Sequence, residues 1–261
     1  MENLQTKNKE TYADDVLRLA LDVGEGMLKN GGEVSRVEDT IERICHAYGA
    51  VHVEVFCIIS LINASVRMED DTYSSQIRRV KSTGMNFSLL EELNGLSREV
   101  CRDVPSLEYF DGKLHELKNK KYGSHALSMF AWMLAAASFA VFFGGGFWEC
   151  LWAAIAGVAM FCIDTYAPRR VSTIAKNVMS AFVAALLAAV SEFIHGGEGS
   201  VIIMGSLMLL VPGVAIGTAM RDILCGELLA GMLKLLQACL AALMLAFGYI
   251  LAATLMGGGA I

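Results

Sequence analysis

Charged side chains are scarce in the second half of this sequence. Residues 125–261 contain five of the 21 lysines and arginines and six of the 27 aspartates and glutamates. An apolar run of roughly 20 residues is long enough to cross the hydrocarbon core of a bilayer. The shortage of charge argues against a water-soluble fold for this half and predicts five membrane-spanning helices, at about 126–143, 147–166, 174–194, 201–219 and 228–256.

Paired cysteines and catalytic motifs are also missing. The seven cysteines are odd in number and scattered, and no two of them form a Cys-x-x-Cys pair. This pattern argues against a disulfide framework and against a zinc site, and it favours small buried hydrophobic residues. The sequence has no Gly-rich phosphate loop, no Gly-x-Ser-x-Gly and no His-Glu-x-x-His. We therefore expect no enzyme activity, no metal and no cofactor.

The chain has fewer basic than acidic residues, and the positions of the basic residues are informative. The formal net charge of −6 argues against a nucleic-acid partner, since such binding relies on lysine and arginine. The polar first residues contain no signal peptide. Arg170, Lys176 and Arg221 lie in connections on one side, whereas the other connections lack basic residues. By the positive-inside rule we expect a cytoplasmic (inner) membrane protein in contact with lipid, with its N-terminus in the cytoplasm and its C-terminus outside.

What remains is a two-domain organisation. Residues 1–122 show four amphipathic helical patterns and three alternating strand patterns, which predict a cytoplasmic soluble α+β domain. Residues 123–261 form the predicted transmembrane domain. The fold class is thus an integral membrane protein, with an α-helical bundle of five transmembrane helices and an N-terminal cytoplasmic α+β domain. Ser35 and Glu38 have capping-box spacing at the start of one helix.

Charged clusters mark two places in the soluble domain. On its second helix they are typical of solvated i,i+4 ladders, although a functional cluster has the same composition. On a strand, arginines either bind an anion or pair with that second helix, and the sequence leaves both open. The residues concerned are Arg36, Glu38, Asp39 and Arg43 on the helix, and Arg78 and Arg79 on the strand.

Ionisable and polar residues inside the membrane are functional candidates because they are costly to insert. Asp164 lies at the inner end of the second predicted span, where a salt bridge and a substrate or proton role are equally plausible. Gln237 and Lys234 face the bundle interior only if the fifth helix packs them there. Otherwise Lys234 extends to the cytoplasmic surface.

The fourth predicted span contains Pro212 and Gly213 in its middle. Proline removes a main-chain hydrogen bond, so the helix should kink or break there. Broken helices at mid-membrane often bind substrate in secondary transporters. A plain kink without function is the alternative.

Two stretches resemble one known family. The first is Gly-Gly-Glu-Val-Ser-Arg-Val-Glu-Asp-Thr-Ile at residues 31–41, with Ala-Tyr-Gly at 47–49. The second comprises Pro-Gly at 212–213, Arg-Asp-Ile-Leu at 221–224, Gly-Glu-Leu at 226–228 and Gly231. Both are similar to signatures of the threonine/serine exporter family.

The resemblance implies a proton-driven secondary exporter of threonine, serine or, in some relatives, small dicarboxylates. It also implies a set of functional positions, in which Asp164 and Asp222 contact a proton or the substrate amine and Arg221 contacts a substrate carboxylate or holds Asp222. The positions are Arg36, Glu38, Asp164, Pro212, Gly213, Arg221 and Asp222.

Full-length members of that family carry about twice as many spans. The resemblance therefore implies half of a split transporter, which works with a second membrane subunit of similar span number unless it forms a homo-oligomer. An odd number of spans requires the second half to run inverted, which is a common transporter plan. The alternatives are a dicarboxylate (succinate-type) exporter subunit, a membrane-anchored sensor or enzyme whose soluble domain carries the activity, and a scaffold for a partner exporter.

Overall fold

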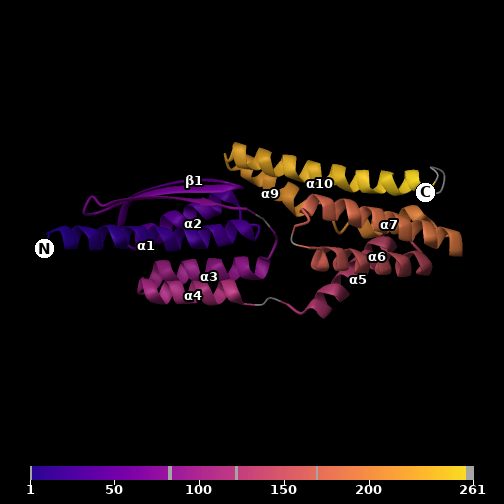
Figure 1. Ribbon diagram of the computed structural model, residues 1–261, viewed down its shortest axis with the longest axis horizontal. Helices are drawn as coiled ribbons and strands as arrows, with labels where there is room; N and C mark the ends of the chain where they lie inside the picture. The colour runs from indigo at the N-terminus through magenta and orange to yellow at the C-terminus, as the bar shows by residue number, and fades with distance from the viewer. Residues whose placement is uncertain (1, 82–83, 121–122, 169, 257–261) are drawn as a thin grey trace. The chain divides into compact units, whose positions relative to one another are not determined.

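The computed structural model describes residues 2–81, 84–120, 123–168 and 170–256 (Figure 1). The described chain is mostly helical, with a single three-stranded sheet. Its internal contacts divide it into two units. The first unit comprises Met1–Tyr122 with Gly217–Leu235, and the second unit comprises Gly123–Ile216 with Leu236–Ile261. The predicted external tail, residues 257–261, and the loop residue Arg169 lie outside the described residues.

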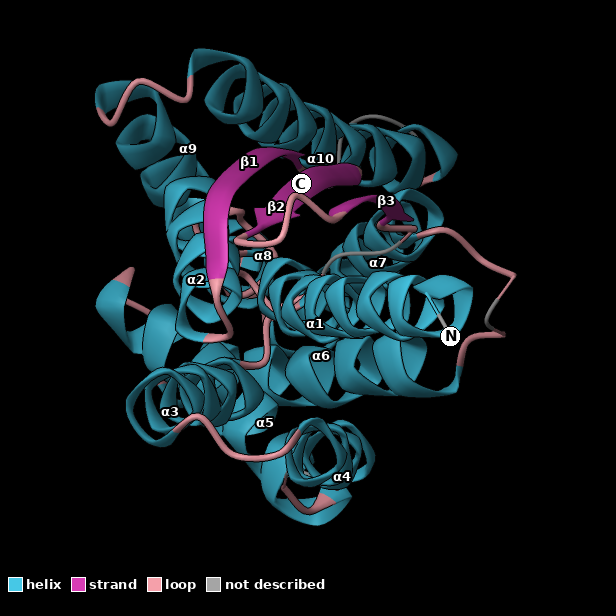
Figure 2. Ribbon diagram, turned by 90° about the vertical axis from the view of Figure 1, so that its left-hand side faces the viewer, coloured by secondary structure: helices cyan, strands magenta, loops and turns pink. Residues whose placement is uncertain are grey.

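The first unit begins with two helices, α1 (Glu2–Lys29) and α2 (Val34–Ala47). An antiparallel sheet of order β1-β2-β3 follows, with β1 at Ala50–Ile58, β2 at Leu61–Met68 and β3 at Tyr73–Arg79. Helices α3 (Phe87–Asp103) and α4 (Leu107–Asn119) come next. Helix α1 contacts β2 and β3, while α2 contacts β1, so one face of the sheet lies against these two helices (Figure 2).

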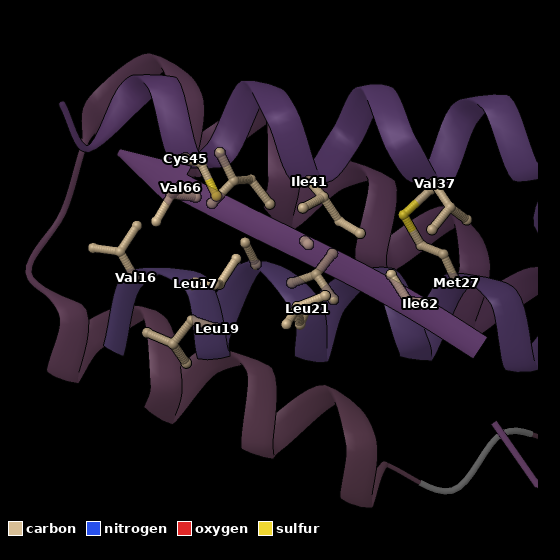
Figure 3. Packing of buried hydrophobic residues seen from close by; sticks show 14 of the residues in the cluster. Val16, Leu17, Leu19, Leu21, Met27, Val37, Ile41, Cys45, Ile62 and Val66 are labelled. Carbon is tan, nitrogen blue, oxygen red and sulfur yellow. The ribbon is translucent and has the colours of Figure 1, made fainter. Parts of the chain in front are cut away.

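The core of the first unit is built from large side chains. Leu17 and Leu21 of α1 face Ile41 of α2, and Ile62 and Val66 of β2 close the layer (Figure 3). All five are at most 1% exposed. Alternate residues of β2 are buried, as expected for a strand with one face on a core.

The predicted capping box at the start of α2 is wrong. Helix α2 begins after Glu33, whose side chain makes no capping hydrogen bond, and Ser35 lies inside the first turn. Glu38 does not reach back to the helix start. Its carboxylate instead accepts a hydrogen bond from the main-chain nitrogen of Cys57 on β1, at 2.7 Å. A tertiary contact has overridden the local pattern.

The second unit contains α5 (His125–Phe142), α6 (Phe147–Tyr166), α7 (Thr173–His195) and α8 (Gly199–Leu207). Small residues bring these helices together. A Cβ added to Gly157 of α6 would lie 2.8 Å from the Trp132 carbonyl oxygen of α5, and one added to Gly205 of α8 would lie 2.8 Å from the Ala140 nitrogen. Such close approach is typical of membrane helix packing.

Two further helices, α9 (Gly213–Leu224) and α10 (Leu228–Leu255), run from one unit into the other. Gly213 and Gly217 do not mark a packing interface within the described part of the chain, where a Cβ added to either meets no atom within 4 Å. Helix α10 has 28 residues, or about 42 Å at 1.5 Å per residue. It is therefore longer than the roughly 30 Å of hydrocarbon that a spanning helix must cross.

Four helices of the described chain are long and apolar enough to cross a membrane: α5, α6, α7 and α10. The predicted span at 201–219 is not one helix, because α8 ends at Leu207 and α9 begins at Gly213. The break expected at Pro212 and Gly213 is therefore present. With 9 and 12 residues, α8 and α9 are each too short to span alone. The chain is a helical multi-pass membrane protein, and its fifth span stays a prediction.

Candidate functional site

The candidate site lies in the first unit, where the turn between α9 and α10 meets α2 and β1. Helix α9 ends before Gly226, whose φ of 100° is in the left-handed region that glycine tolerates. The Glu227 nitrogen donates to the Asp222 carbonyl oxygen at 2.9 Å. A Cβ on Gly231 of α10 would lie 2.7 Å from the Ala219 carbonyl oxygen of α9, so the two helices approach closely at this hairpin.

Asp222 and Lys234 form a buried ion pair within this hairpin. Lys234 Nζ donates to Asp222 Oδ2 at 2.6 Å, and the Asp222 side chain is only 1% exposed. Its other oxygen, Oδ1, is buried and has no hydrogen-bond partner among the described residues. A buried charge needs its partner, because an unpaired one is strongly destabilising. The free oxygen leaves a polar position open to a cationic group or a proton.

Arg221, the preceding residue of α9, reaches a different carboxylate. Its Nη1 donates to Glu33 Oε1 at 2.8 Å, and Arg36 Nε lies 3.8 Å from the other Glu33 oxygen. The alternative that Arg221 holds Asp222 is not what the structure shows. Glu33 was missed as a site residue, although it lies inside the first signature stretch. The contact joins the two signature stretches across 188 residues of sequence.

Glu38 adds a carboxylate with altered acidity to this region. Burial raises its pKa to about 7; Glu227 also raises it, while the hydrogen bond from Cys57 opposes the shift. Burial likewise raises the pKa of the Cys57 thiol to about 12, with electrostatic contributions from Glu38, Lys234, Glu227 and Asp222. These groups are thus within electrostatic range of one thiol, and one of them changes charge near neutral pH.

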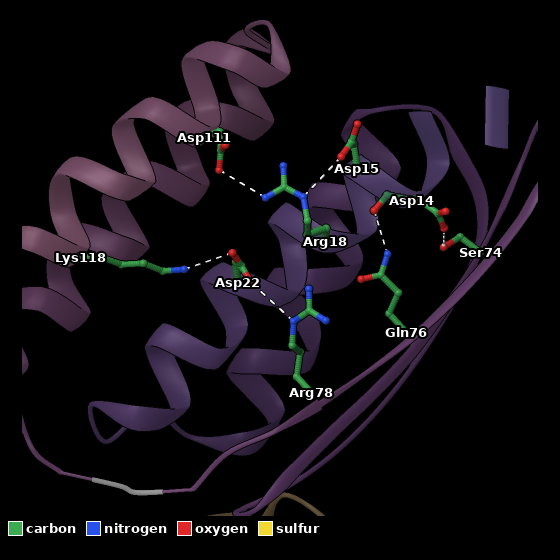
Figure 4. A network of polar contacts seen from close by, with 9 residues as sticks. All are labelled: Asp14, Asp15, Arg18, Asp22, Ser74, Gln76, Arg78, Asp111 and Lys118. Atoms are coloured by element: carbon green, nitrogen blue, oxygen red, sulfur yellow. Dashed lines mark hydrogen bonds and ion pairs between the residues drawn. The ribbon is translucent and has the colours of Figure 1, made fainter. Parts of the chain in front are cut away.

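The other arginines predicted as candidates in the first unit, Arg43, Arg78 and Arg79, are not among the groups around Asp222 and Arg221. Asp39 and Arg43 form an exposed i,i+4 pair at 2.8 Å, as expected for a solvated ladder. Arg78 of β3 pairs with Asp22 of α1 at 3.5 Å (Figure 4). Arg78 thus pairs with a helix rather than standing free for an anion, but the helix is α1 and not the second helix, which was the predicted partner. Arg79 is exposed and has no carboxylate partner among the described residues.

Figure 4 shows that this pairing is part of a wider network around α1. Lys118 of α4 also reaches Asp22, at 3.2 Å. Arg18 lies 3.4 Å from both Asp15 and Asp111 of α4. The network ties α1 to β3 on one side and to α4 on the other.

The two remaining candidates lie in the second unit. Lys176 Nζ donates to the Asp164 carbonyl oxygen at 2.5 Å and lies 3.4 Å from its Oδ1. Asp164 is 61% exposed, so it forms a salt bridge at the end of α6. Gln237 of α10 is exposed and makes no hydrogen bond to the described residues. Within the described residues, no three His, Cys, Asp or Glu side chains gather as a metal site.

Comparison with known proteins connects this site to a family. A family model described as "Putative threonine/serine exporter" matches residues 18–256. "Pheromone-regulated membrane protein 10" of Debaryomyces hansenii is 27% identical over 208 residues, which are 77% of this chain and 20% of that protein. "Probable threonine/serine exporter" of Mycobacterium tuberculosis is 22% identical over 233 residues, 87% of this chain and 43% of that protein. The chain thus matches less than half the length of either relative. No solved structure matches it significantly.

Proposed function

The chain belongs to the threonine/serine exporter family, whose model spans residues 18–256, and from this premise we propose that it is a subunit of a secondary transporter. It exports small polar metabolites, with threonine and serine as the first candidates, across the cytoplasmic membrane. The proton gradient drives export. No step in this function is enzymatic.

The observation that carries the proposal is a pair of neighbouring ion pairs. Asp222 and Arg221 are consecutive in α9, and each is held by an oppositely charged side chain from another element. A zwitterionic amino acid carries one group of each kind. Its ammonium replaces Lys234 at Asp222, and its carboxylate replaces Glu33 at Arg221. Substrate binding thereby keeps an opposite charge next to both Asp222 and Arg221.

Proton coupling is assigned to the carboxylates of the same region. Glu38 is half-buried and has a pKa of about 7, so it gains and loses a proton near physiological pH. Asp222 offers a second oxygen without a hydrogen-bond partner. A proton that arrives at either carboxylate weakens the local hold on cations and favours release of the substrate ammonium. Proton uptake and substrate release thus use the same groups.

The broken helix supplies a second support for transport. Five residues, 208–212, separate α8 from α9 and end in Pro212, which has no N–H to donate. Main chain of this kind is tolerated at membrane depth only where protein or a water-filled cavity surrounds it. We assign the Pro212–Gly213 break to the substrate pathway.

The transporter requires a second half. The chain matches less than half the length of its relatives, and its predicted spans are odd in number. We propose that a second membrane subunit, or a second copy of this chain, completes the pathway in inverted orientation. The N-terminus then lies in the cytoplasm and the C-terminus outside.

The test is threonine efflux driven by a pH gradient, measured in native membrane vesicles that contain the chain. We expect Asp222→Asn to lower the rate at least tenfold, because Lys234 then loses its buried counter-charge. Glu33→Gln should raise the efflux rate at low substrate, since Arg221 no longer has a competing carboxylate. Arg79→Ala is the matched control and should keep the wild-type rate. Wild-type efflux in both Asp222→Asn and Glu38→Gln would remove this site from the mechanism.

A further inference from the structure

A groove of about 640 Å³ lies between α2 and α3 in the first unit. Its volume is within the range of small-molecule sites. The two helices run side by side in the same direction. At one end, a Cβ on Gly31, just before α2, would lie 3.9 Å from the Phe87 ring at the start of α3. At the other end, the charges of Asp39 and Arg43 act on the Cys101 thiol near the end of α3.

The groove is positively charged, although the chain as a whole is acidic. Four arginines line it against two carboxylates, whereas the chain carries a net charge of −6. The arginines are Arg36, Arg43, Arg98 and Arg102, and the carboxylates are Asp39 and Glu91. A local excess of guanidinium in an acidic protein indicates an anionic ligand, because arginine recognises phosphate and carboxylate oxygens with paired donors.

Not all of these guanidinium groups are neutralised within the chain. Arg43 pairs with Asp39 at 2.8 Å, and Arg102 pairs with its neighbour Asp103 at 2.7 Å. Arg98 has no carboxylate partner among the described residues, and its Nε donates only to the Asn94 carbonyl oxygen at 3.2 Å. The carboxylate near Arg36 is that of Glu33, at 3.8 Å. Glu33 also pairs with Arg221, so it is shared between two arginines.

The two ends of the groove differ in chemistry. Arg43, Arg98 and Arg102 lie towards the end where α2 and α3 finish. Phe87 and Leu90 lie at the start of α3, at the end that also contains Arg36 of α2, and Phe87 is 56% exposed. A ligand that matches this polarity has an anionic head and a flat or apolar body. An exposed aromatic ring can stack on such a body.

We propose that this groove binds a small organic phosphate with a ring, of the size of a nucleoside monophosphate. Its phosphate contacts Arg98 and Arg43, and its ring packs against Phe87 and Leu90. The groove adjoins the groups assigned to transport at Arg36, which also lies 3.8 Å from Glu33, but none of Arg98, Leu90 or Phe87 takes part in the proposed export step. It provides the first unit with a regulatory input beyond transport.

Binding is measured by calorimetry on the full-length chain in detergent, with adenosine monophosphate and inorganic phosphate as probes. We expect the monophosphate to bind more tightly than inorganic phosphate. Its affinity should fall as the salt concentration increases. Arg98→Ala should lower the affinity for the monophosphate at least tenfold. Phe87→Ala should lower the affinity for the monophosphate and leave the affinity for inorganic phosphate unchanged. Arg79→Ala, which removes an exposed arginine outside the groove, should bind as the wild type does.

Cys101 locates the bound probe. It is the partly exposed cysteine of the groove, whereas Cys45 and Cys57 in the same unit are buried. The monophosphate should slow alkylation of Cys101, measured by peptide mass spectrometry, and Arg98→Ala should abolish that protection. The proposal is overturned if the monophosphate does not bind, or if it binds equally to Arg98→Ala and leaves Cys101 unprotected. Neither result bears on export.

Discussion

The two units of this chain pack their interiors with side chains of different size. The first unit buries large side chains such as Phe110, Leu17 and Ile41, and it keeps most of its charges on the outside, with Asp222 as a buried exception. The second unit buries alanine and glycine and leaves large apolar side chains exposed, among them Phe193 at 93%. In water, burial of large apolar surface drives folding. In lipid that driving force is absent, and close backbone approach replaces it. The small buried residues and large exposed apolar residues of the second unit fit a lipid environment.

The largest expected effect that separates the units is Phe110→Ala. Phe110 is fully buried and its ring lies parallel to that of Tyr48, with centroids 6.2 Å apart. Loss of a buried phenylalanine costs about 3–5 kcal/mol of unfolding free energy. All three tryptophans, Trp132, Trp148 and Trp152, lie in the second unit. Thermal unfolding followed by far-UV circular dichroism should therefore shift to lower temperature, while the tryptophan fluorescence transition stays in place.

Phe110→Leu is the control for that experiment. It keeps most of the apolar volume and should cost clearly less than the alanine variant. Equal shifts of both transitions would show that the two units unfold as one, and the contrast between them would then lose its thermodynamic meaning.

A smaller effect is expected from Gly157→Val in the second unit. The added Cβ would lie 2.8 Å from the Trp132 carbonyl oxygen and 2.9 Å from the Ala136 Cβ, so α5 and α6 must separate. Overpacking of this kind costs about 1–3 kcal/mol. Tryptophan fluorescence should report a lower transition temperature. In the first unit, a Cβ added to Gly112 of α4 meets no atom of the described residues within 4 Å, so Gly112→Ala should not destabilise. A destabilised Gly112→Ala with an unaffected Gly157→Val would reverse the comparison.

The smallest effect concerns pH and belongs to the first unit alone. Burial raises the pKa of Glu38 from its ordinary value of 4.5 to about 7. A carboxyl group with a raised folded-state pKa stabilises the fold fully below the unfolded-state value, and this contribution is lost as pH rises through the folded-state value. Between pH 4.5 and 7, the wild type should therefore lose stability relative to Glu38→Gln. Melting temperatures of both proteins across this range measure the difference, and parallel curves would contradict the assignment.

Local patterns predicted much of the fold, because periodicity and helix breakers act over a few residues. The alternation that places Ile62 and Val66 on one face of β2, and the helix break before Gly213, are of this kind. The Ser35–Glu38 spacing failed for a physical reason. Glu38 gains a hydrogen bond from Cys57 that a short-range pattern does not contain.

The site itself depends on contacts that spacing does not encode. Arg221 and Glu33 are separated by 188 residues, and nothing in either local sequence selects one as the partner of the other. The motif resemblance pointed to both stretches but not to their contact. The sequence left open whether Lys234 faces the bundle interior or extends to the cytoplasmic surface. In the structure its side chain pairs with the buried carboxylate of Asp222.

Helix α10 meets α7 of the second unit at a glycine. Gly248 packs closely on the main chain of Val178 in α7. Any side chain at position 248 would force the two helices apart, so a single hydrogen atom in place of a methyl group sets their spacing.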